Sequence, residues 1–400
     1  MIGNELDQPR ENFALINGRL ILPQKVVNHK AIVVQKGVVV GFSEVDRLDK
    51  NTELIDVGGR YIAPGLIDIH THGALGHSFN EATEEAFAVI TAEHIKRGVT
   101  SLLATTSTAP IPKLVECLEL SQQWMKESQE GAQVLGVHIE GPYFSLEQRG
   151  AQDPSNIRNP DDGTVDQLLA YHDVIKIMTY APELPGALEL TKKLASLGVV
   201  PAAGHSSAQE KDVLAAKEVG LRHIIHIWSA QSTTVREGPW RKPGLLEVTL
   251  ASNDLTVEMI TDNRHLPATL MKLAYKCVGP DRLCIISDAT NGAGLPEGSR
   301  FRMMNSTEAE VQNGVSIMLD RTAFAGSTTL LNQMIPILID VVGVPLVEAI
   351  RMGSLNPARV IGVDNHKGSL EINKDADIAI YNEDFTAWRT MVNGRWVYAT

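Results

Sequence analysis

Apolar runs that end in polar residues recur through the middle of the chain, with helical patterns between several of them. The runs occupy 65–70, 99–106, 134–140, 174–181, 199–205, 223–228, 255–261 and 283–288. Apolar positions with helical spacing fill 81–98, 111–128, 187–198 and 209–220. Strands that alternate with helices in this way predict a (β/α)8 barrel. The alternative is an open doubly wound sheet, but that fold usually has fewer strands and a glycine-rich phosphate loop, and neither GxGxxG nor GxxxxGKS/T occurs at 65–80.

Short strand patterns, separated by glycine and proline, fill both ends of the chain. They cover 13–64 and the last 35 residues. Asn393-Gly394 lies between two apolar runs, and this dipeptide predicts a β-hairpin. We predict that residues 1–62 and 367–400 pair into one small β-sandwich and that residues 63–366 form the barrel domain. A β-rich cap at each end is the less specific interpretation.

The composition is that of a folded protein with an acidic surface. Apolar residues make up 44% and charged residues 21% of the chain, and the formal net charge is −12. A nucleic-acid-binding surface needs clustered Lys and Arg, so we exclude that function class. No apolar run approaches the roughly 20 residues that span a bilayer, and the first 13 residues contain no apolar core of a signal peptide. Cys117, Cys277 and Cys284 have no close spacing, so we expect no disulfide framework and a cytoplasmic protein.

Five of the eight predicted strands end in side chains of the kinds that bind metal ions. These side chains are His70 and His72, Glu140, His205, His226 and Asp288. The carboxyl ends of the strands form the active-site face of a barrel, so we expect these side chains to meet there. Residues two apart in an extended segment point the same way, which aims His70 and His72 together, with Asp68 on the same side. Histidine and carboxylate without cysteine suit Zn²⁺, with Fe²⁺, Mn²⁺ or Co²⁺ as alternatives.

The other histidines are given no ligand role from the sequence. His138 shares a face with Glu140 and is interpreted as a hydrogen-bonding partner behind the ligands. His223 lies three residues before His226 and is expected on the opposite face of its strand. Four more are expected in solvated turns or helices: His29, His94, His172 and His366. A loop position over the site is only the minor interpretation for His77.

Several motifs together carry a family resemblance. They are, in chain order, APGLIDIHTHG, HIEGPYF, AAGHSS, HIWSA, ITDNRH, IISDA, FAGST and LNPARVIG. In this order and spacing they resemble the N-acetylglucosamine-6-phosphate deacetylase family of the amidohydrolase superfamily, from about residue 14 to the end. The first motif alone would indicate only the superfamily, whose members are metal-dependent hydrolases on a (β/α)8 barrel. The segment KGSLEINKDADIAIYNED resembles the return of such chains to their small β-domain.

The resemblance implies a metal role for five of the matching positions. It makes Glu140, His205 and His226 the ligands of a principal divalent metal. It makes His70 and His72 the ligands of a second metal, with Glu140 as the bridge. Some members of the family lack this second pair and use one metal, so one or two ions per chain are possible here.

The resemblance also implies residues that act on the substrate. Asp288 matches the catalytic aspartate, and His265 matches a histidine that contacts the substrate. The loop at 324–328, which contains Ala325, matches a second segment that contacts the substrate. The family further suggests a homodimer in which a partner chain reaches the site.

Three departures from the family pattern fall on the substrate side. Gln152 stands where the family usually has a histidine, and Ser229, before Ala230, stands where it has an asparagine. The segment that carries the arginine for the sugar phosphate is several residues longer here, and Arg236 and Arg241 both compete for that role. Because all the expected metal ligands are present, hydrolysis is better supported than the identity of the sugar.

Together these features predict a metal-dependent hydrolase of the N-acetyl amide of an amino sugar. The first hypothesis is N-acetylglucosamine 6-phosphate, which gives glucosamine 6-phosphate and acetate. We expect Asp288 to accept a proton from water and to deliver it to the leaving amine, with His138 as the next candidate. We favour binding of the phosphate by Arg236 or Arg241 over a pocket that binds only the hydroxyl groups of the sugar.

Three other functions remain open from the sequence. One is a deacetylase for another N-acetylhexosamine, of the galactosamine type or without phosphate. Another is a dihydroorotase-like or N-acyl-amino-acid hydrolase. Many of these use a carboxylated lysine at the end of the fourth strand, whereas Lys176 lies early in that run. The last is an inactive barrel that serves as a scaffold, which should hold no stoichiometric metal.

Overall fold

The computed structural model of the protein describes residues 11–126, 130–303 and 307–400. The segment on which the signal-peptide prediction rests lies outside these residues, apart from 11–13. No helix in the described ranges is long and apolar enough to cross a bilayer.

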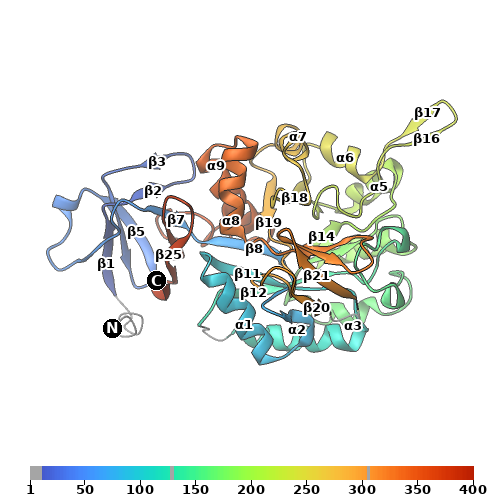
Figure 1. The fold of residues 1–400 in the computed structure, drawn as a ribbon, viewed down its shortest axis with the longest axis horizontal. Coiled ribbons are helices and arrows are strands. Elements are labelled where there is room, and N and C mark those ends of the chain that lie inside the picture. Colours follow the sequence, from blue (N-terminus) through green and yellow to red (C-terminus); the bar gives the residue numbers. More distant parts are fainter. Residues whose placement is uncertain (1–10, 127–129, 304–306) are drawn as a thin grey trace.

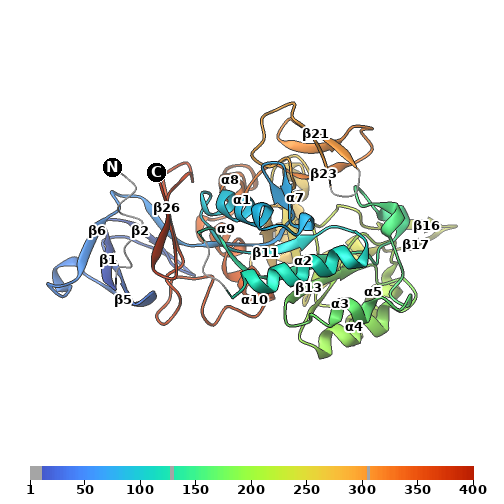
Figure 2. The same cartoon turned by 90° about the horizontal axis from the view of Figure 1, so that it is seen from below.

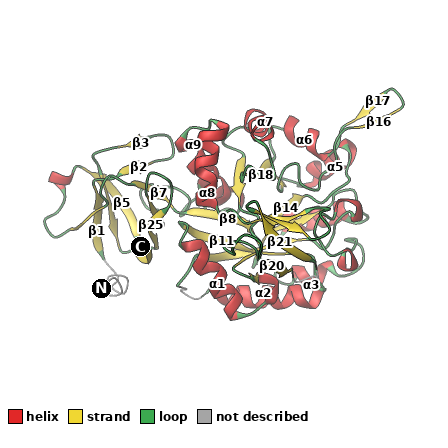
Figure 3. Ribbon diagram, in the orientation of Figure 1, coloured by secondary structure: helices red, strands yellow, loops and turns green. Residues whose placement is uncertain are grey.

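A parallel sheet of eight strands curls around the centre of the molecule (Figure 1, Figure 3). Its two edges meet where Thr71 forms a parallel bridge with Ala289, and where the backbone N–H of His72 donates to the Ala289 carbonyl at 2.7 Å. The predicted (β/α)8 barrel is therefore confirmed. In sheet order the strands are β8 (Leu66–Thr71), β11 (Val99–Thr106), β12 (Gln133–Glu140), β13 (Ile175–Tyr180), β14 (Val200–Ala203), β15 (His223–Ile224), β18 (Thr256–Ile260) and β19 (Leu283–Ile286).

Helices cover the outside of the barrel (Figure 2), and this packing explains the continuous apolar runs of the strands. Every position of β8 and β11 is buried, as expected for strands covered on both faces. The helices are α1 (Glu84–Ile95), α2 (Ile111–Trp124), α3 (Val165–Leu169), α4 (Ala187–Ser196), α5 (Glu210–Val219), α6 (Leu245–Ala251), α7 (Ala268–Val278), α8 (Leu331–Pro336), α9 (Leu346–Met352) and α10 (Leu355–Val360).

The four helices predicted from the sequence are confirmed as α1, α2, α4 and α5, although the predicted end of α2 at 127–128 lies outside the described residues. The sixth strand is shorter than predicted. β15 ends at Ile224 because the chain turns at His226, where φ is +23° and the backbone is no longer extended.

Two further sheets form a small β domain at the left of Figure 1, and both ends of the chain contribute to it. β7 (Tyr61–Pro64) pairs antiparallel with β24 (Ile378–Tyr381), so the ends share one sheet as predicted. Asn393 and Gly394 form the predicted hairpin turn with φ of +49° and +75°. The domain limits of 62 and 367 remain a prediction. The other strands are β1 (Asn12–Ile16), β2 (Arg19–Ile21), β3 (Val26–Val27), β4 (Ala31–Gln35), β5 (Val38–Ser43), β6 (Glu53–Asp56), β25 (Ala387–Val392) and β26 (Arg395–Ala399).

A buried ion pair holds the C-terminal return against the start of the barrel. The Lys367 ammonium lies 2.7 Å from the Asp377 carboxylate and 3.0 Å from that of Asp375, with only 3% of its side chain exposed. The Asp377 carbonyl accepts a hydrogen bond from Gly65, next to the first barrel strand. Burial lowers the pKa of Lys367, but the two carboxylates outweigh this and raise it above its ordinary value. The lysine therefore stays charged at neutral pH, and its contribution to stability is lost only as the pH rises through this raised pKa.

Replacing Lys367 by methionine is expected to lower the free energy of unfolding by about 3–5 kcal/mol, because it leaves buried carboxylate without its partner. Urea unfolding at pH 7 measures this. The exposed pair of Lys30 with Glu44, at 3.9 Å, offers a control, and Lys30→Met should cost less than about 1 kcal/mol. Equal effects of the two substitutions would contradict the prediction.

Two smaller elements lie at the carboxyl ends of the barrel strands. A four-stranded antiparallel sheet, called here the mouth sheet, follows β19 and reaches over the barrel mouth (Figure 2). A two-stranded hairpin projects from the body of the molecule (Figure 1). The mouth sheet contains β20 (Arg300–Arg302), β21 (Glu308–Gln312), β22 (Val315–Met318) and β23 (Phe324–Ser327), and the hairpin contains β16 (Val235–Glu237) and β17 (Trp240–Lys242).

The segment expected as a substrate-contacting loop at 324–328 is instead mostly strand β23. It is held by pairing with β22 and by a parallel bridge from Ser327 to Ala289. A further short pair, β9 (Gly73–Ala74) with β10 (His77–Ser78), follows the first barrel strand.

Candidate active site

A cavity of about 300 Å³ opens at the carboxyl ends of the barrel strands, under the mouth sheet. Most of the residues singled out from the sequence line it, although their elements are far apart along the chain. Those residues are His72, Glu140, Gln152, His205, His226, Ser229, Ala230, His265, Asp288 and Ala325. His70 lies just beneath the floor and is completely buried.

The Glu140 carboxylate is the point on which the histidines converge. Its Oε1 lies 3.1 Å from His226 Nε2, 3.2 Å from His205 Nε2 and 3.4 Å from His70 Nε2. Its Oε2 lies 3.4 Å from His72 Nε2. The ends of four barrel strands thus bring four histidines together around one carboxylate, Glu140, which is only 2% exposed.

Two of the histidine tautomers follow from the partners of the other ring nitrogen. His205 Nδ1 lies 2.8 Å from the Gln148 carbonyl, and His70 Nδ1 lies 2.7 Å from Glu258 Oε2. A carbonyl and a carboxylate only accept, so each Nδ1 carries the hydrogen and donates it. In the neutral form of each ring, the Nε2 lone pair therefore faces Glu140.

This arrangement fits a divalent cation. Acceptor faces acceptor across 3.2–3.4 Å, and His70 Nε2 is buried with no hydrogen-bond partner among the described residues. Two sets of ligand atoms lie within 4.8 Å of one another: Glu140, His205 and His226, called here the principal position, and His70, His72 and Glu140, called the second position. Imidazole and carboxylate donors suit Zn²⁺ and related ions.

The charges around His70 also favour a positive charge at this place. Burial lowers the pKa of His70, but the carboxylates of Glu258 and Glu140 raise it well above its ordinary value.

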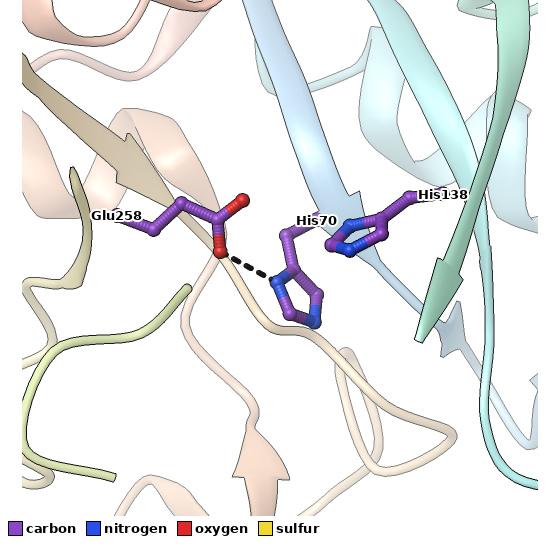
Figure 4. A group of neighbouring side chains, drawn as sticks. All are labelled: His70, His138 and Glu258. Carbon is purple, nitrogen blue, oxygen red and sulfur yellow. Dashed lines mark hydrogen bonds and ion pairs between the residues drawn. The ribbon is translucent and has the colours of Figure 1, made fainter. Parts of the chain in front are cut away.

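A third set of possible ligands, His70 with His138 and Glu258, differs from these two because its members are already hydrogen-bonded (Figure 4). The two nitrogens of His138 already bond the Ile69 carbonyl at 3.1 Å and the Thr179 hydroxyl at 2.7 Å.

Asp288 lies beside the two metal positions. Its Oδ1 is 3.3 Å from His72 Nε2 and 3.7 Å from His70 Nε2, and its backbone N–H donates to the His70 carbonyl at 2.9 Å. Burial raises the pKa of the Asp288 carboxyl, but the hydrogen bond with His72 and the charges of the histidines lower it below its ordinary value. At neutral pH it is therefore a carboxylate that can accept a proton.

The backbone at three of these residues has positive φ, which is uncommon outside glycine. The values are +46° at His205, +23° at His226 and +45° at Asp288. Such strain clusters at functional sites because the surrounding structure must hold it in place.

Gln152 is held in one orientation by one hydrogen-bond donor and one hydrogen-bond acceptor. Its Oε1 accepts from the Thr108 backbone N–H at 2.8 Å, and its Nε2 donates to Glu140 Oε2 at 2.5 Å. Exchanging the amide oxygen and nitrogen would break both contacts. Because Gln152 also lines the cavity, the amide has a fixed donor beside the metal positions.

His265 is also fixed from behind. Its Nδ1 lies 2.7 Å from the Asp262 carboxylate, so Nδ1 donates, and its ring packs against Phe324 with the centroids 4.8 Å apart. Nε2 is the nitrogen left for the cavity. Ser229, Ala230 and Ala325 contribute to the wall nearby.

Neither Arg236 nor Arg241 lines the cavity of its own chain. Both lie on the projecting hairpin, where they bond only to backbone carbonyls of Gly238 and Pro239 among the contacts described. The described lining of the cavity contains no lysine or arginine. The sequence-based assignment of these arginines to the substrate therefore finds no support within one chain.

The comparison with known families agrees with this geometry. A model of the amidohydrolase family matches residues 61–397. The chain belongs to the amidohydrolase family. The matched segment contains every residue around Glu140 described above.

Relatives of this amidohydrolase include proteins with named activities. N-acetylglucosamine-6-phosphate deacetylase from Haemophilus influenzae is 31% identical, over 96% of this chain and 99% of that protein. N-acetylgalactosamine-6-phosphate deacetylase from Escherichia coli O157:H7 is 28% identical, over 94% and 97%. The crystal structure of N-acetylglucosamine-6-phosphate deacetylase from Pasteurella multocida has a TM-score of 0.91 and 28% identity, and covers 97% of this chain and 100% of that chain. The chain thus belongs to the N-acetylglucosamine-6-phosphate deacetylase group of the amidohydrolase family.

Sequence reasoning misplaced or missed several residues of this amidohydrolase. His94 was expected in solvent but is completely buried, with Nε2 3.2 Å from the Thr71 hydroxyl. His223 was given no role from the sequence, yet its ring is completely buried and bonds the Glu258 carboxylate at 3.0 Å. Asp68 does not line the cavity; its Oδ1 accepts from the backbone N–H of His70 instead.

Glu258 itself was not recognised. The one available signal was a charged residue in the middle of an otherwise apolar strand pattern, LTVEMI, which a buried strand does not use without a partner. The cavity walls also include residues outside the motifs that the sequence analysis named, such as Ser107, Thr290 and Met303.

Proposed function

We propose that this amidohydrolase removes the acetyl group from an N-acetylated amino sugar 6-phosphate, with N-acetylglucosamine 6-phosphate as the first substrate. The observation that carries the proposal is the convergence of four histidine Nε2 atoms on Glu140, with Asp288 beside them, at the floor of a cavity of about 300 Å³. The named activities of the relatives support it. The galactosamine-type substrate is the second candidate because one relative of similar identity has that activity.

The reaction consumes one water, breaks the amide C–N bond, and releases acetate and the amino sugar. Glu140, His205 and His226 would hold a metal at the principal position, and His70 and His72 one at the second. A divalent ion there, Zn²⁺ first, would supply Lewis-acid polarisation of the acetyl carbonyl and a hydroxide nucleophile at neutral pH. We infer that binding of the divalent metal is required for activity.

Asp288 supplies the proton transfers in this proposal. Its carboxylate takes a proton as the nucleophile attacks and gives that proton to the nitrogen as the C–N bond breaks. Gln152 contributes a neutral hydrogen-bond donor near the acetyl oxygen, and a neutral donor stabilises a developing negative charge less than an imidazolium would. His265 and Ser229 face the sugar.

A homodimer would bring the missing cations to the cavity. Hairpin β16–β17 projects from the molecule, and Trp240 at its end is 73% exposed. A two-stranded hairpin is marginally stable alone in water, which favours contact with another surface. We propose that a second copy of the chain receives this hairpin, that Arg236 or Arg241 there meets the phosphate, and that the enzyme works in the cytoplasm.

One of the two arginines, Arg236 or Arg241, is proposed to bind the phosphate. Replacing that arginine by alanine is expected to raise KM for the 6-phosphate by about 10–100-fold, because a charge-assisted hydrogen bond is worth roughly 1.5–3 kcal/mol. KM for the same sugar without phosphate should change little. Steady-state kinetics of Arg236→Ala and Arg241→Ala on both substrates measure this. The control is Lys242→Ala, which removes a cation that is paired with Glu237 on the same hairpin. If both arginine variants treat the two substrates alike, the phosphate assignment fails while the deacetylase assignment stands.

The experiment that tests the function is a deacetylation panel. N-acetylglucosamine, N-acetylgalactosamine and N-acetylmannosamine are each supplied with and without 6-phosphate, and acetate release is measured on metal-loaded protein. The highest kcat/KM is expected for N-acetylglucosamine 6-phosphate. No acetate from any of the six compounds would refute the proposal.

A further inference from the structure

Glu258 is a completely buried carboxylate in the middle of barrel strand β18. Its ion-pair partners among the described residues are two histidines, His70 and His223, and no lysine or arginine. Burying a carboxylate is costly unless it is paired and hydrogen-bonded. The charge of Glu258 is therefore retained in the barrel interior because both of its oxygens are bonded to histidines.

The contacts of Glu258 reach across the barrel. Oε2 accepts from His70 Nδ1 at 2.7 Å, although the two residues are 188 positions apart (Figure 4). Oε1 accepts from His223 Nε2 at 3.0 Å. A longer contact of 3.4 Å reaches the backbone N–H of His226, but not its ring. Of the histidines around Glu140, only His70 has its ring bonded to this carboxylate.

The hydrogen bond to Glu258 determines which ring nitrogen of His70 is available to a cation at the cavity floor. Because the carboxylate accepts, Nδ1 holds the hydrogen, and in the neutral ring, which is the form that binds a metal, Nε2 presents a lone pair. That Nε2 lies 3.4 Å from Glu140 and 3.7 Å from Asp288 and has no hydrogen-bond partner among the described residues. The ring of His138 packs against that of His70 at 4.5 Å and 72°, which restrains its rotation.

No histidine of the principal position has its ring bonded to Glu258 among the described contacts, and only the backbone N–H of His226 approaches it, at 3.4 Å. His205 is held by the Gln148 carbonyl at 2.8 Å, which fixes its tautomer without Glu258. The His205 ring is thus supported by a backbone carbonyl and the His70 ring by a buried carboxylate.

We propose that Glu258 is a positioning residue for the second metal position, where it holds His70 in the tautomer that a divalent cation needs at Nε2. The inference rests on the proposed function in that it concerns ions at the same site. A carboxylate behind a metal-ligating histidine raises the basicity of the ligand and fixes the ring, and losing it typically costs 10–100-fold in metal affinity. Glu258 therefore sets how tightly the second ion is held.

The substitution Glu258→Gln tests the proposal because an amide has one acceptor where the carboxylate has two. It cannot accept from both His70 and His223, so one of the two histidines must face an N–H group. Full-length protein freed of metal by a chelator is titrated with Zn²⁺, and bound zinc per chain is measured by equilibrium dialysis with elemental analysis. The wild type should bind two ions. The variant should bind the principal ion with unchanged affinity and the second about 10–100-fold more weakly.

Two further variants make the result specific. Glu93→Gln alters a buried carboxylate on α1 whose ion-pair partners among the described residues are Lys96 and Arg97, and it should bind two ions like the wild type. Glu258→Asp keeps the charge but withdraws the carboxylate from His70, and it replaces the glutamine variant if that protein fails to fold. It should also lose affinity for the second ion first.

Three outcomes would overturn the inference. They are one bound ion in the wild type, unchanged affinity for both ions in the Glu258 variant that folds, and a weakening of the principal ion as large as that of the second. Activity is not part of this measurement. A protein that shows the expected zinc binding but releases no acetate would refute the proposed function alone.

Discussion

Glu140→Ala is expected to lose the principal metal and to lower kcat by at least about 10³-fold. Glu140 faces the Nε2 atoms of His205 and His226 at 3.2 and 3.1 Å, so its removal takes away the only carboxylate at that position among the described ligand sets. A catalytic metal contributes several kcal/mol, and each 1.36 kcal/mol is tenfold in rate. Elemental analysis of the purified variant and steady-state kinetics measure the two effects together. His205→Ala should behave in the same way.

Two comparisons sharpen this first prediction. The double substitution of His70 and His72 by alanine should remove at most a second ion and leave the principal one. Glu93→Ala removes a buried carboxylate outside the cavity and should leave metal and kcat unchanged. Full metal content and full turnover in Glu140→Ala would show that the site is wrongly assigned.

Asp288→Asn is expected to keep its metal and to lower kcat by about 10²–10⁴-fold. Asparagine has nearly the same shape, so the bond from its backbone N–H to the His70 carbonyl should persist. It cannot accept and return a proton, and general acid–base help is worth that range. Asp254→Asn, at an exposed pair with Lys217, is the control and should leave kcat unchanged.

An unchanged kcat in Asp288→Asn would move the proton transfers to another group. His138 was the next candidate from the sequence, but both of its ring nitrogens are bonded, to the Ile69 carbonyl and the Thr179 hydroxyl. Burial lowers its pKa to about 3, so it is neutral at pH 7. The structure therefore leaves Asp288 as the better candidate by geometry as well as by resemblance.

The sequence by itself determined the barrel, the hairpin at Asn393-Gly394 and the candidate ligands at the strand ends. Each of these depends on a short-range property. A strand covered on both faces is a continuous apolar run, a two-residue turn with positive φ favours Asn-Gly, and a polar residue at the end of such a run lies at the mouth of the barrel. Glu140, His205 and Asp288 could be named for this reason before their distances were known.

Only the tertiary structure decided how these residues are supported. The bond between Glu258 and His70 joins residues 188 apart, and Gln152 is fixed by partners on two other segments. The same holds for the burial of His94 and for the hairpin that carries Arg236 and Arg241 away from the cavity of its own chain. Such contacts arise where the barrel closes and side chains from distant strands meet, and no local periodicity specifies which partner a buried polar atom finds there.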